Sequence, residues 1–220
     1  MSSIASNIER LVTEVDLPVR VAAALAAGHR GAAERWRMSP QQSYGRHAGP
    51  APHTARAAAV MLLLFRRDGR WHLPLTERPL TLVRHAGQIS LPGGAVEPRE
   101  ASHAAAVREL REELGVVPEG DVLGRLADCY VFASDFMITP WVAATYVEPR
   151  WQPDAREVQS VVELPLEVLL SDDAVGRLTI ERGPLMFHAP CLRVGDARIW
   201  GATSTILAEL GGVLRGLMRV

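Results

Sequence analysis

The chain has 220 residues, 48% of which are hydrophobic, and a formal net charge of −1. A chain of this length can bury a full core, and its near-zero net charge gives it no electrostatic attraction to nucleic acid, so we expect no nucleic-acid partner. All 24 basic residues are arginine. The lack of lysine excludes a Walker A phosphate loop and any mechanism that begins with a lysine Schiff base.

The first 50 residues read as a helical extension in front of a main domain that spans residues 51–220. Ile4, Ile8 and Leu11 recur at helical spacing, and the run at 19–27 suggests a second helix before a stretch rich in Pro, Gly and His. No residue here has recognisable chemistry. The extension could pack on the domain, cover the site or support a homodimer.

The apolar runs and the cysteines of the sequence bear on the cellular compartment. The apolar run at residues 21–27 is too short to span a membrane and follows acidic residues rather than a cationic leader. Cys129 and Cys191 lack the spacing of a metal or redox site, which favours free thiols in a reducing compartment. We therefore expect a cytoplasmic protein with no membrane partner.

The elements that follow alternate between strand and helix. Two β-rich runs flank Asp68-Gly69 and predict a hairpin. The pattern predicts strands at 57–65, 71–76, 122–132, 138–146 and 157–164, and helices at 101–114 and 203–217. This order indicates the α/β or α+β class.

The helix at 101–114 is the most strongly predicted element. It contains neither Pro nor Gly, is rich in Ala, Leu, Glu and Arg, and ends before Gly115. Its apolar residues share one stripe, and its glutamates share another: Ala106, Val107, Leu110 and Leu114 on the first, Glu109, Glu112 and Glu113 on the second. We therefore expect the helix to pack with one side and to present three carboxylates with the other.

Three clustered carboxylates favour a cation as their partner. Glutamate pairs at this spacing repel by about 0.2–0.5 kcal/mol each on an exposed helix. Oxygen ligands without nearby Cys or a His pair select Mg²⁺ or Mn²⁺ over zinc. The alternative is a solvated acidic face. The preceding Leu91-Pro92-Gly93-Gly94 favours the cation, because two glycines allow a sharp turn that exposes backbone carbonyls and amides to a metal-bound diphosphate.

At this point the chain resembles the Nudix hydrolases. Their signature box matches Gly94, five residues, Glu100, seven residues, and then Arg108-Glu109-Leu110-Arg111-Glu112-Glu113-Leu114-Gly115-Val116. The resemblance implies the Nudix fold, a mixed sheet sandwiched between helices, and Mg²⁺- or Mn²⁺-dependent cleavage of a nucleoside diphosphate linked to another group. It implies that the metal ligands are Glu109, Glu112, Glu113 and the backbone carbonyl of Gly93. It further implies that Arg108 orients the glutamates and that Glu100 braces the loop and the helix.

A second motif narrows the substrate. Residues 75–79 and 84–94 resemble the extra signature that precedes the box in the coenzyme A diphosphatases of this superfamily, with departures at Pro79, Val83 and Leu91. Segments 131–140 and 199–203 also resemble this subgroup. The implied substrate contacts are Arg78, Arg84, His85, Gly93 and Gly94, since guanidinium grips phosphate through two parallel hydrogen bonds. Ordinary surface arginines and a hydrogen-bonded loop histidine are the alternatives.

The resemblance also nominates Glu157, which opens a predicted strand, as a further acidic ligand or base. A solvated carboxylate at a strand end is the alternative.

Three functions stay open. The first is hydrolysis of coenzyme A or an acyl derivative to 3′,5′-ADP and 4′-phosphopantetheine. The second is hydrolysis of another nucleoside diphosphate derivative, such as ADP-ribose or a dinucleotide. The third is a non-catalytic nucleotide-binding module.

Overall fold

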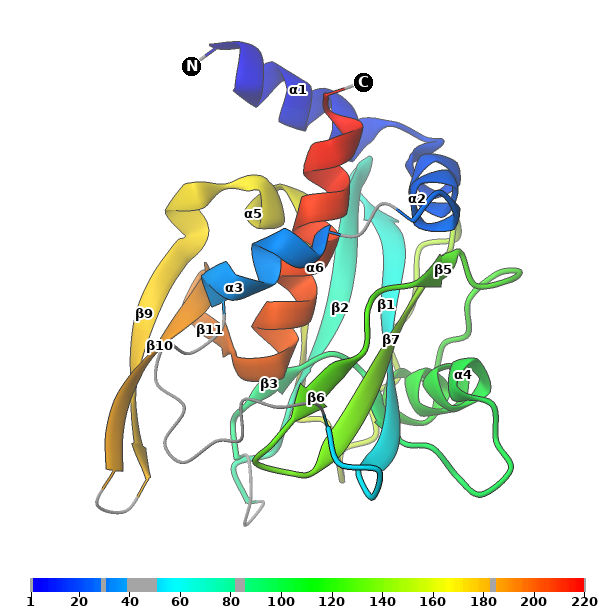
Figure 1. Cartoon of the computed structure of the whole chain (residues 1–220). Coiled ribbons are helices and arrows are strands. Elements are labelled where there is room, and N and C mark those ends of the chain that lie inside the picture. Colours follow the sequence, from blue (N-terminus) through cyan, green and yellow to red (C-terminus); the bar gives the residue numbers. More distant parts are fainter. Residues whose placement is uncertain (1, 29–30, 39–50, 82–85, 183–184, 220) are drawn as a thin grey trace.

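A mixed β-sheet forms the centre of the computed structural model, which describes residues 2–28, 31–38, 51–81, 86–182 and 185–219 (Figure 1). In these residues the sheet has eight strands, with β3-β2-β1-β7-β5 as its main path and β4, β6 and β8 paired to β1, β7 and β2. The strands are β1 Arg56–Arg67, β2 Arg70–Glu77, β3 Ile89–Ser90, β4 Gly93–Ala95, β5 Gly124–Arg125, β6 Cys129–Val131, β7 Phe136–Ala144 and β8 Ser160–Pro165.

The first two strands form the predicted hairpin. Asp68 and Gly69, at its turn, have φ values of 50° and 77°. Two successive left-handed residues match the backbone twist of a two-residue hairpin turn. β1 then pairs with β7 in parallel on its other edge, along nine residue pairs from Arg56–Phe136 to Leu64–Ala144. β1 is therefore the central strand around which the sheet is arranged.

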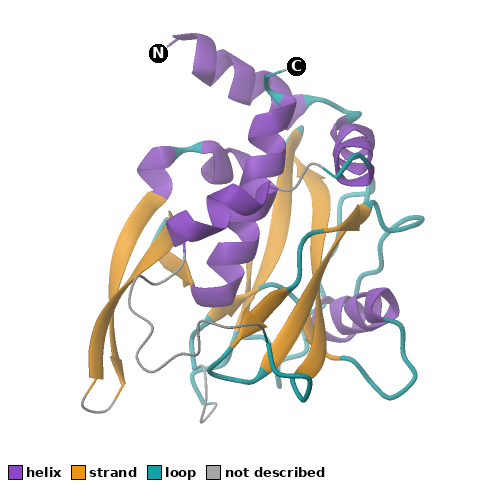
Figure 2. Ribbon diagram, in the orientation of Figure 1, coloured by secondary structure: helices purple, strands orange, loops and turns teal. Residues whose placement is uncertain are grey.

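Helices cover both faces of the sheet (Figure 2). Alternate side chains of β1 point to opposite faces, as the two-residue period of a strand requires. Ala59, Met61 and Leu63 pack with α4 (Ser102–Leu114), whereas Leu62 and Leu64 belong to the cluster that contains α6 (Gly201–Leu217). The expected sandwich of a mixed sheet between helices is confirmed.

The N-terminal residues pack against the same core. They form α1 (Ser2–Thr13), α2 (Leu17–Ala26), the short 3-10 helix η1 (Gly31–Glu34) and α3 (Arg35–Met38). Leu11, Leu17 and Val21 are at most 2% exposed and belong to the α6 cluster. A Cβ added to Gly31 would lie 2.7 Å from Gly212 Cα on α6, so the two backbones touch. These helices therefore pack on the rest of the domain.

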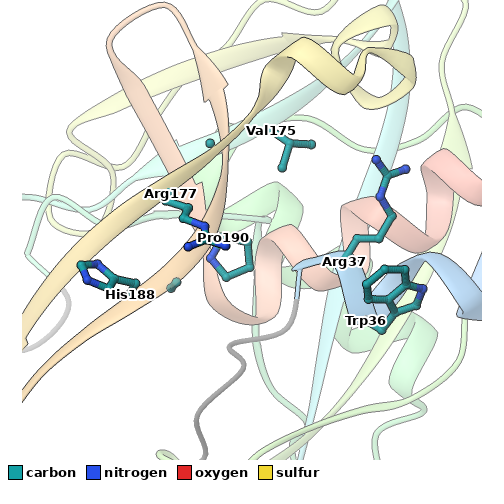
Figure 3. Close-up of a pocket in the computed structure, with 8 residues that line it drawn as sticks. Trp36, Arg37, Val175, Arg177, His188 and Pro190 are labelled. Carbon is teal, nitrogen blue, oxygen red and sulfur yellow. The ribbon is translucent and has the colours of Figure 1, made fainter.

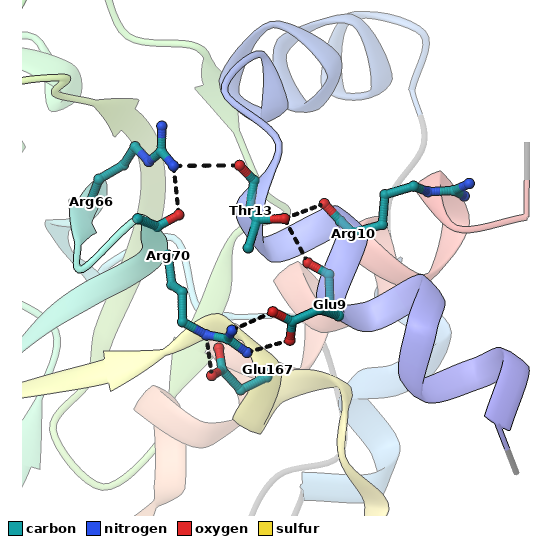
Figure 4. A network of polar contacts seen from close by, with 7 residues as sticks. Glu9, Arg10, Thr13, Arg66, Arg70 and Glu167 are labelled. Carbon is teal, nitrogen blue, oxygen red and sulfur yellow. Dashed lines mark hydrogen bonds and ion pairs between the residues drawn. The ribbon is translucent and has the colours of Figure 1, made fainter.

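Polar contacts also tie α1 to the β1–β2 hairpin (Figure 4). Arg70 donates to both carboxylate oxygens of Glu9 at 2.6 Å and to Glu167 at 3.2 Å. Arg66 donates to the Thr13 carbonyl at 3.4 Å. Such exposed ion pairs contribute about 0–1 kcal/mol each. The apolar contacts of α1 and α2 therefore provide most of the stabilisation.

A second sheet follows the central one. After α5 (Leu166–Leu170) and the 3-10 helix η2 (Asp172–Ala174), the antiparallel strands β9 (Val175–Arg182), β10 (Leu185–Val194) and β11 (Ala197–Trp200) run in the order β11-β10-β9. This sheet was not among the sequence predictions. The predicted strand at 122–132 is in fact two short strands, β5 and β6.

In the part of the chain that the structure describes, no helix combines the length and hydrophobicity of a membrane span.

Candidate active site

The helix with the three glutamates is α4, and its limits agree with the sequence prediction. It ends at Gly115, whose φ of 72° is left-handed and whose N–H donates to the Arg111 carbonyl at 2.9 Å. A residue with a Cβ adopts this conformation only at a cost, so glycine favours the end of the helix here. The helix places Glu109, Glu112 and Glu113 in its last two turns.

The three glutamates differ strongly in exposure. Glu113 is only 6% exposed, whereas the side chain of Glu109 is 15% exposed and that of Glu112 is 58% exposed. The expectation that all three carboxylates lie on an open face is therefore wrong for Glu113. Its position is three residues after buried Leu110, only about 60° away around the helix, so it falls at the edge of the packed stripe.

Arg108 joins the helix to the loop before it. Its guanidinium donates to Glu100 at 2.9 and 3.1 Å, to Glu109 at 2.9 Å, to Glu112 at 3.0 Å and to the Ala95 carbonyl at 3.1 Å. The hydrogen bonds from Arg108 lower the pKa of Glu100, and its Oε2 also accepts from the Glu97 N–H at 3.0 Å. One arginine thus holds three carboxylates on the side of α4 that faces the loop.

Glu113 is the most perturbed acid of this group. Its pKa is raised to about 8, first by burial and then by the charges of Glu109 and Glu157, while a backbone hydrogen bond with Gly93 and the charge of Arg78 oppose the shift. Burial also raises the pKa of Glu109. Among the described residues, Glu113 Oε2 is buried without a hydrogen-bond partner. A buried oxygen without a hydrogen-bond donor is unfavourable, and a cation bound there would satisfy it.

The carboxylates of α4 suit a hard divalent cation. Their ligand atoms are all oxygens, their charges repel one another, and one of the oxygens is buried without a hydrogen-bond partner. Among the described residues, however, no three or more His, Cys, Asp or Glu side chains lie close enough together to hold a metal ion. Two of the three glutamates, Glu109 and Glu112, instead pair with Arg108.

The glycine loop lies between the sheet and these carboxylates. Gly93 and Gly94 belong to β4 and pair with Val60 and Ala59 of β1. Gly93 has a φ of 154°, and a Cβ there would lie 2.6 Å from Val60 Cα. A Cβ on Gly94 would lie 2.6 Å from Glu109 Cδ. Gly93 must be glycine, because a Cβ there would meet the backbone of β1, whereas a Cβ on Gly94 would meet the end of the Glu109 side chain. The loop backbone therefore approaches the Glu109 carboxylate closely.

A cavity of about 310 Å³ opens on the other side of this loop, on the α6 face of the sheet. One part of its wall is polar and is formed by Arg78, Gln88, Ser90, Gly93 and Gly94. The rest is largely apolar and comes from four elements: Ala58 and Val60 from β1, Val131 from β6, Phe136 and Ile138 from β7, and Ala202 and Ile206 from α6. The loop thus separates a ligand-sized cavity from the glutamates of α4.

The other residues named from the sequence take different places. Arg78 lines the cavity, its Nε is buried without a partner among the described residues, and its charge reaches Glu113. Arg84 and His85, with Val83, lie outside the described residues. Glu157 is exposed and lies in a turn at residues 155–157, not at the start of a strand, because β8 begins only at Ser160. Its charge still acts on Glu109 and Glu113.

Sequence reasoning did not identify the residues that complete the cavity. Ser134 lies far from Thr203 and Ile206 of α6 in the chain, and the two segments meet only in the fold. The sequence signal for them was the resemblance of segments 131–140 and 199–203 to the coenzyme A diphosphatases, but that resemblance identified no individual substrate contact.

A second cavity, of about 330 Å³, shares no lining residue with the first. It lies between α3 and the β9–β10 hairpin and is lined by Trp36, Arg37, Val175, Arg177, His188 and Pro190, among others (Figure 3). Arg37 already pairs with Glu34 and Asp172. None of the residues named from the signature box lies in this cavity, so the first cavity is the candidate site.

Comparison with known proteins agrees with this geometry. The family model of the NUDIX domain matches residues 55–182, which is more than half of the chain. The chain belongs to the Nudix hydrolase family. NudL of Salmonella newport (strain SL254), named an uncharacterized Nudix hydrolase, is 34% identical over 157 residues, which cover 70% of this chain and 81% of NudL. Members of the family generally use divalent metal ions.

Solved Nudix structures are more distant. The MutT Nudix hydrolase of Burkholderia pseudomallei has 19% identity and a TM-score of 0.45, with 70% of this chain and 97% of that chain covered. The Nudix domain of NrtR from Shewanella oneidensis, solved with ADP ribose, has 19% identity and a TM-score of 0.42, with 55% and 79% covered. The family assignment rests on the sequence matches. The matched domain ends before α6, which supplies one wall of the cavity.

Proposed function

We propose that this protein is a metal-dependent diphosphatase that cleaves coenzyme A or an acyl derivative into 3′,5′-ADP and a 4′-phosphopantetheine product. The observation that supports it best is the buried Glu113 carboxylate. One of its oxygens has no partner among the described residues, and it lies beside Glu109 behind a glycine loop that borders a ligand-sized cavity.

The residues of the signature box would bind the cation and hold its ligands in position. Glu109, Glu112, Glu113 and the carbonyl of Gly93 would hold the cation. When bound, Mg²⁺ or Mn²⁺ lowers the pKa of a water molecule and neutralises the charge of the diphosphate. Arg108 holds Glu109 and Glu112 in place through charge-assisted hydrogen bonds.

Substrate contacts would come from the cavity side of the loop. Arg78, with a buried Nε that lacks a partner among the described residues, would donate to phosphate oxygens. Arg84 and His85 belong to the same proposal on the strength of the upstream motif. Glu157 would add an acidic group next to Glu109 and Glu113, whose pKa values its charge already raises.

The coenzyme A assignment is supported by the upstream motif and by the shape of the cavity. Its polar end borders the glycine loop, and its apolar walls suit an aliphatic arm. A cytoplasmic location belongs to the same proposal, supported by two cysteines that form no disulfide.

One observation favours a second candidate, a Nudix hydrolase that acts on another nucleoside diphosphate derivative. Leu91, where the coenzyme A signature has phenylalanine, lines the cavity itself. The smaller side chain changes the wall that the substrate would touch.

The test is hydrolysis of coenzyme A, 3′-dephospho-coenzyme A, ADP-ribose and a dinucleoside polyphosphate with Mg²⁺ and with Mn²⁺, with products identified by mass. Release of 3′,5′-ADP from coenzyme A at the highest kcat/KM supports the proposal. A higher kcat/KM on another substrate favours the second candidate. No turnover with either metal contradicts both and leaves a nucleotide-binding module.

A further inference from the structure

We infer that Arg56 binds a second phosphate group of the substrate, the 3′-phosphate of a coenzyme A-type ligand, at the rim of the cavity. The identity of this phosphate rests on the proposed function. The position and charge of Arg56 rest on the structure alone.

The first step is the register of β1. Side chains two residues apart point to the same face of a strand, so Arg56 shares a face with Ala58 and Val60. Both of these line the cavity. Val60 pairs with Gly93 of the glycine loop. Four residues of extended strand cover about 13 Å, so Arg56 stands about that far along β1 from the level of Gly93.

The second step is the placement of the guanidinium. Arg56 Cζ lies 4.0 Å from the centroid of the Phe136 ring, and Nη2 donates to the Ser134 carbonyl at 3.0 Å. Phe136 and Ser134 both line the cavity. The stacked ring and the carbonyl hold the guanidinium against the wall that β7 and the turn before it provide.

The third step is the charge. Within the part of the chain that the structure describes, none of the ion pairs includes Arg56. The nearby Asp135 carboxylate accepts a hydrogen bond from the Tyr130 hydroxyl at 2.9 Å. Arg108 and Arg67, in contrast, each bind two or more carboxylates. A guanidinium has five N–H donors, so Arg56 can still donate to an anion.

Two cations at separate points of one cavity fit a ligand with two separate anionic groups. Arg78 lies at the polar end, with Gln88, Ser90 and the glycine loop. Arg56 lies further along the same face. A diphosphate at the loop and a phosphate on the ribose would meet both. ADP-ribose and dephospho-coenzyme A lack that ribose phosphate, so Arg56 would act on the choice of substrate rather than on the reacting atoms.

The test compares binding of 3′,5′-ADP and 5′-AMP by isothermal titration in the presence of Mg²⁺. We expect the native protein to bind 3′,5′-ADP about tenfold more tightly than 5′-AMP, and Arg56→Gln to reduce that preference to about twofold or less. Arg177→Gln, which removes an exposed guanidinium from β9, is the matched control and should keep the preference. Arg56→Lys should retain part of it.

Two results would overturn the inference: a native protein without the preference, or a preference that survives Arg56→Gln. Thermal melting of each variant shows that it is folded. A separate measurement of coenzyme A hydrolysis distinguishes failure of this inference from failure of the proposed function. If coenzyme A is hydrolysed but Arg56→Gln leaves the preference intact, the inference fails and the proposed function stands. If coenzyme A is not hydrolysed but the preference depends on Arg56, the proposed function fails and the phosphate site stands.

Discussion

The backbone of Gly94 touches the carboxylate of Glu109, so closely that a single added methyl group would lie 2.6 Å from Glu109 Cδ. Glu109 is also held by Arg108 at 2.9 Å. The loop that borders the cavity and the helix with the glutamates are thus in direct contact at one carboxylate. Any change at this contact should move a proposed metal ligand without touching the core.

Gly94→Ala is therefore expected to lower kcat by at least tenfold, since displacement of about 1 Å at a catalytic group can cost about a hundredfold. The clash is with the end of a side chain, so the melting temperature should change little. Gly216→Ala is the control, because a Cβ there meets nothing within 4 Å. Unchanged kcat in Gly94→Ala would show that the Glu109 carboxylate can move without consequence.

Divalent metal should stabilise the fold through the glutamates of α4. A ligand at 100 times its dissociation constant raises the free energy of unfolding by about 2.7 kcal/mol. We expect Mg²⁺ or Mn²⁺ to raise the melting temperature of the native protein and of Glu181→Gln, which changes an exposed residue on β9. Glu109→Gln should lose most of this increase. An equal increase in all three proteins would place the metal elsewhere.

The stability of the metal-free protein should depend on pH through Glu113. The folded protein keeps the Glu113 proton up to a pKa of about 8, whereas the unfolded chain releases it near 4.5. Between these values the folded state binds more protons, so its stability falls as the pH rises, by at most about 1.4 kcal/mol per pH unit. Urea unfolding in EDTA measures this slope.

Glu113→Gln supplies the comparison for that slope. The neutral amide cannot titrate, so its stability should decline less between pH 5 and 8 than that of the native protein. Parallel pH profiles for the two proteins would mean that Glu113 titrates normally and is not the buried acid of this site.

The link between α3 and α6 should depend on a buried ion pair. Glu209 is 0% exposed and pairs with Arg35, and it also accepts from the Ala127 N–H at 3.0 Å. Removing one partner of a buried pair costs about 3–5 kcal/mol, because the remaining charge is left without compensation. We therefore expect Arg35→Met to destabilise the protein by about that amount in urea unfolding.

Two further variants test the cause. Arg35→Met combined with Glu209→Leu should recover much of the loss, since no charge is then buried alone. Arg37→Met, which breaks more exposed pairs with Glu34 and Asp172, should cost about 1 kcal/mol or less. Equal losses for Arg35→Met and Arg37→Met would contradict this account of the N-terminal segment.

Local patterns in the sequence predicted much of the fold. The hairpin at Asp68-Gly69 and the helix that ends at Gly115 depend on turn chemistry and helical periodicity, and both are present. The β9–β10–β11 sheet was missed. Its strands include Pro190 and Gly176, residues that weaken a strand signal, and pairing with their neighbours decides their conformation.

The site was predictable only where its residues are consecutive or nearly so. The signature box named Glu109, Glu112 and Glu113, but the burial of Glu113 depends on packing that helical spacing does not determine. Arg56 and Ile206 belong to no local motif. Only the fold brings Ile206 to the same cavity as Arg78 and places Arg56 over the ring of Phe136 in the wall of that cavity. The apolar face of a helix can be read from its period, whereas the meeting of three distant segments cannot.

The central claim is that the glutamates of α4 act with a divalent metal to hydrolyse a diphosphate. Glu112 tests it most directly because its side chain is 58% exposed and can be changed without disturbing the core. The measurement is kcat of the native protein and of Glu112→Gln on the best substrate of the panel, across a range of Mn²⁺ concentrations, with melting curves of both. We expect Glu112→Gln to be folded and to lose nearly all turnover at every Mn²⁺ concentration. A folded Glu112→Gln with native turnover would contradict the account.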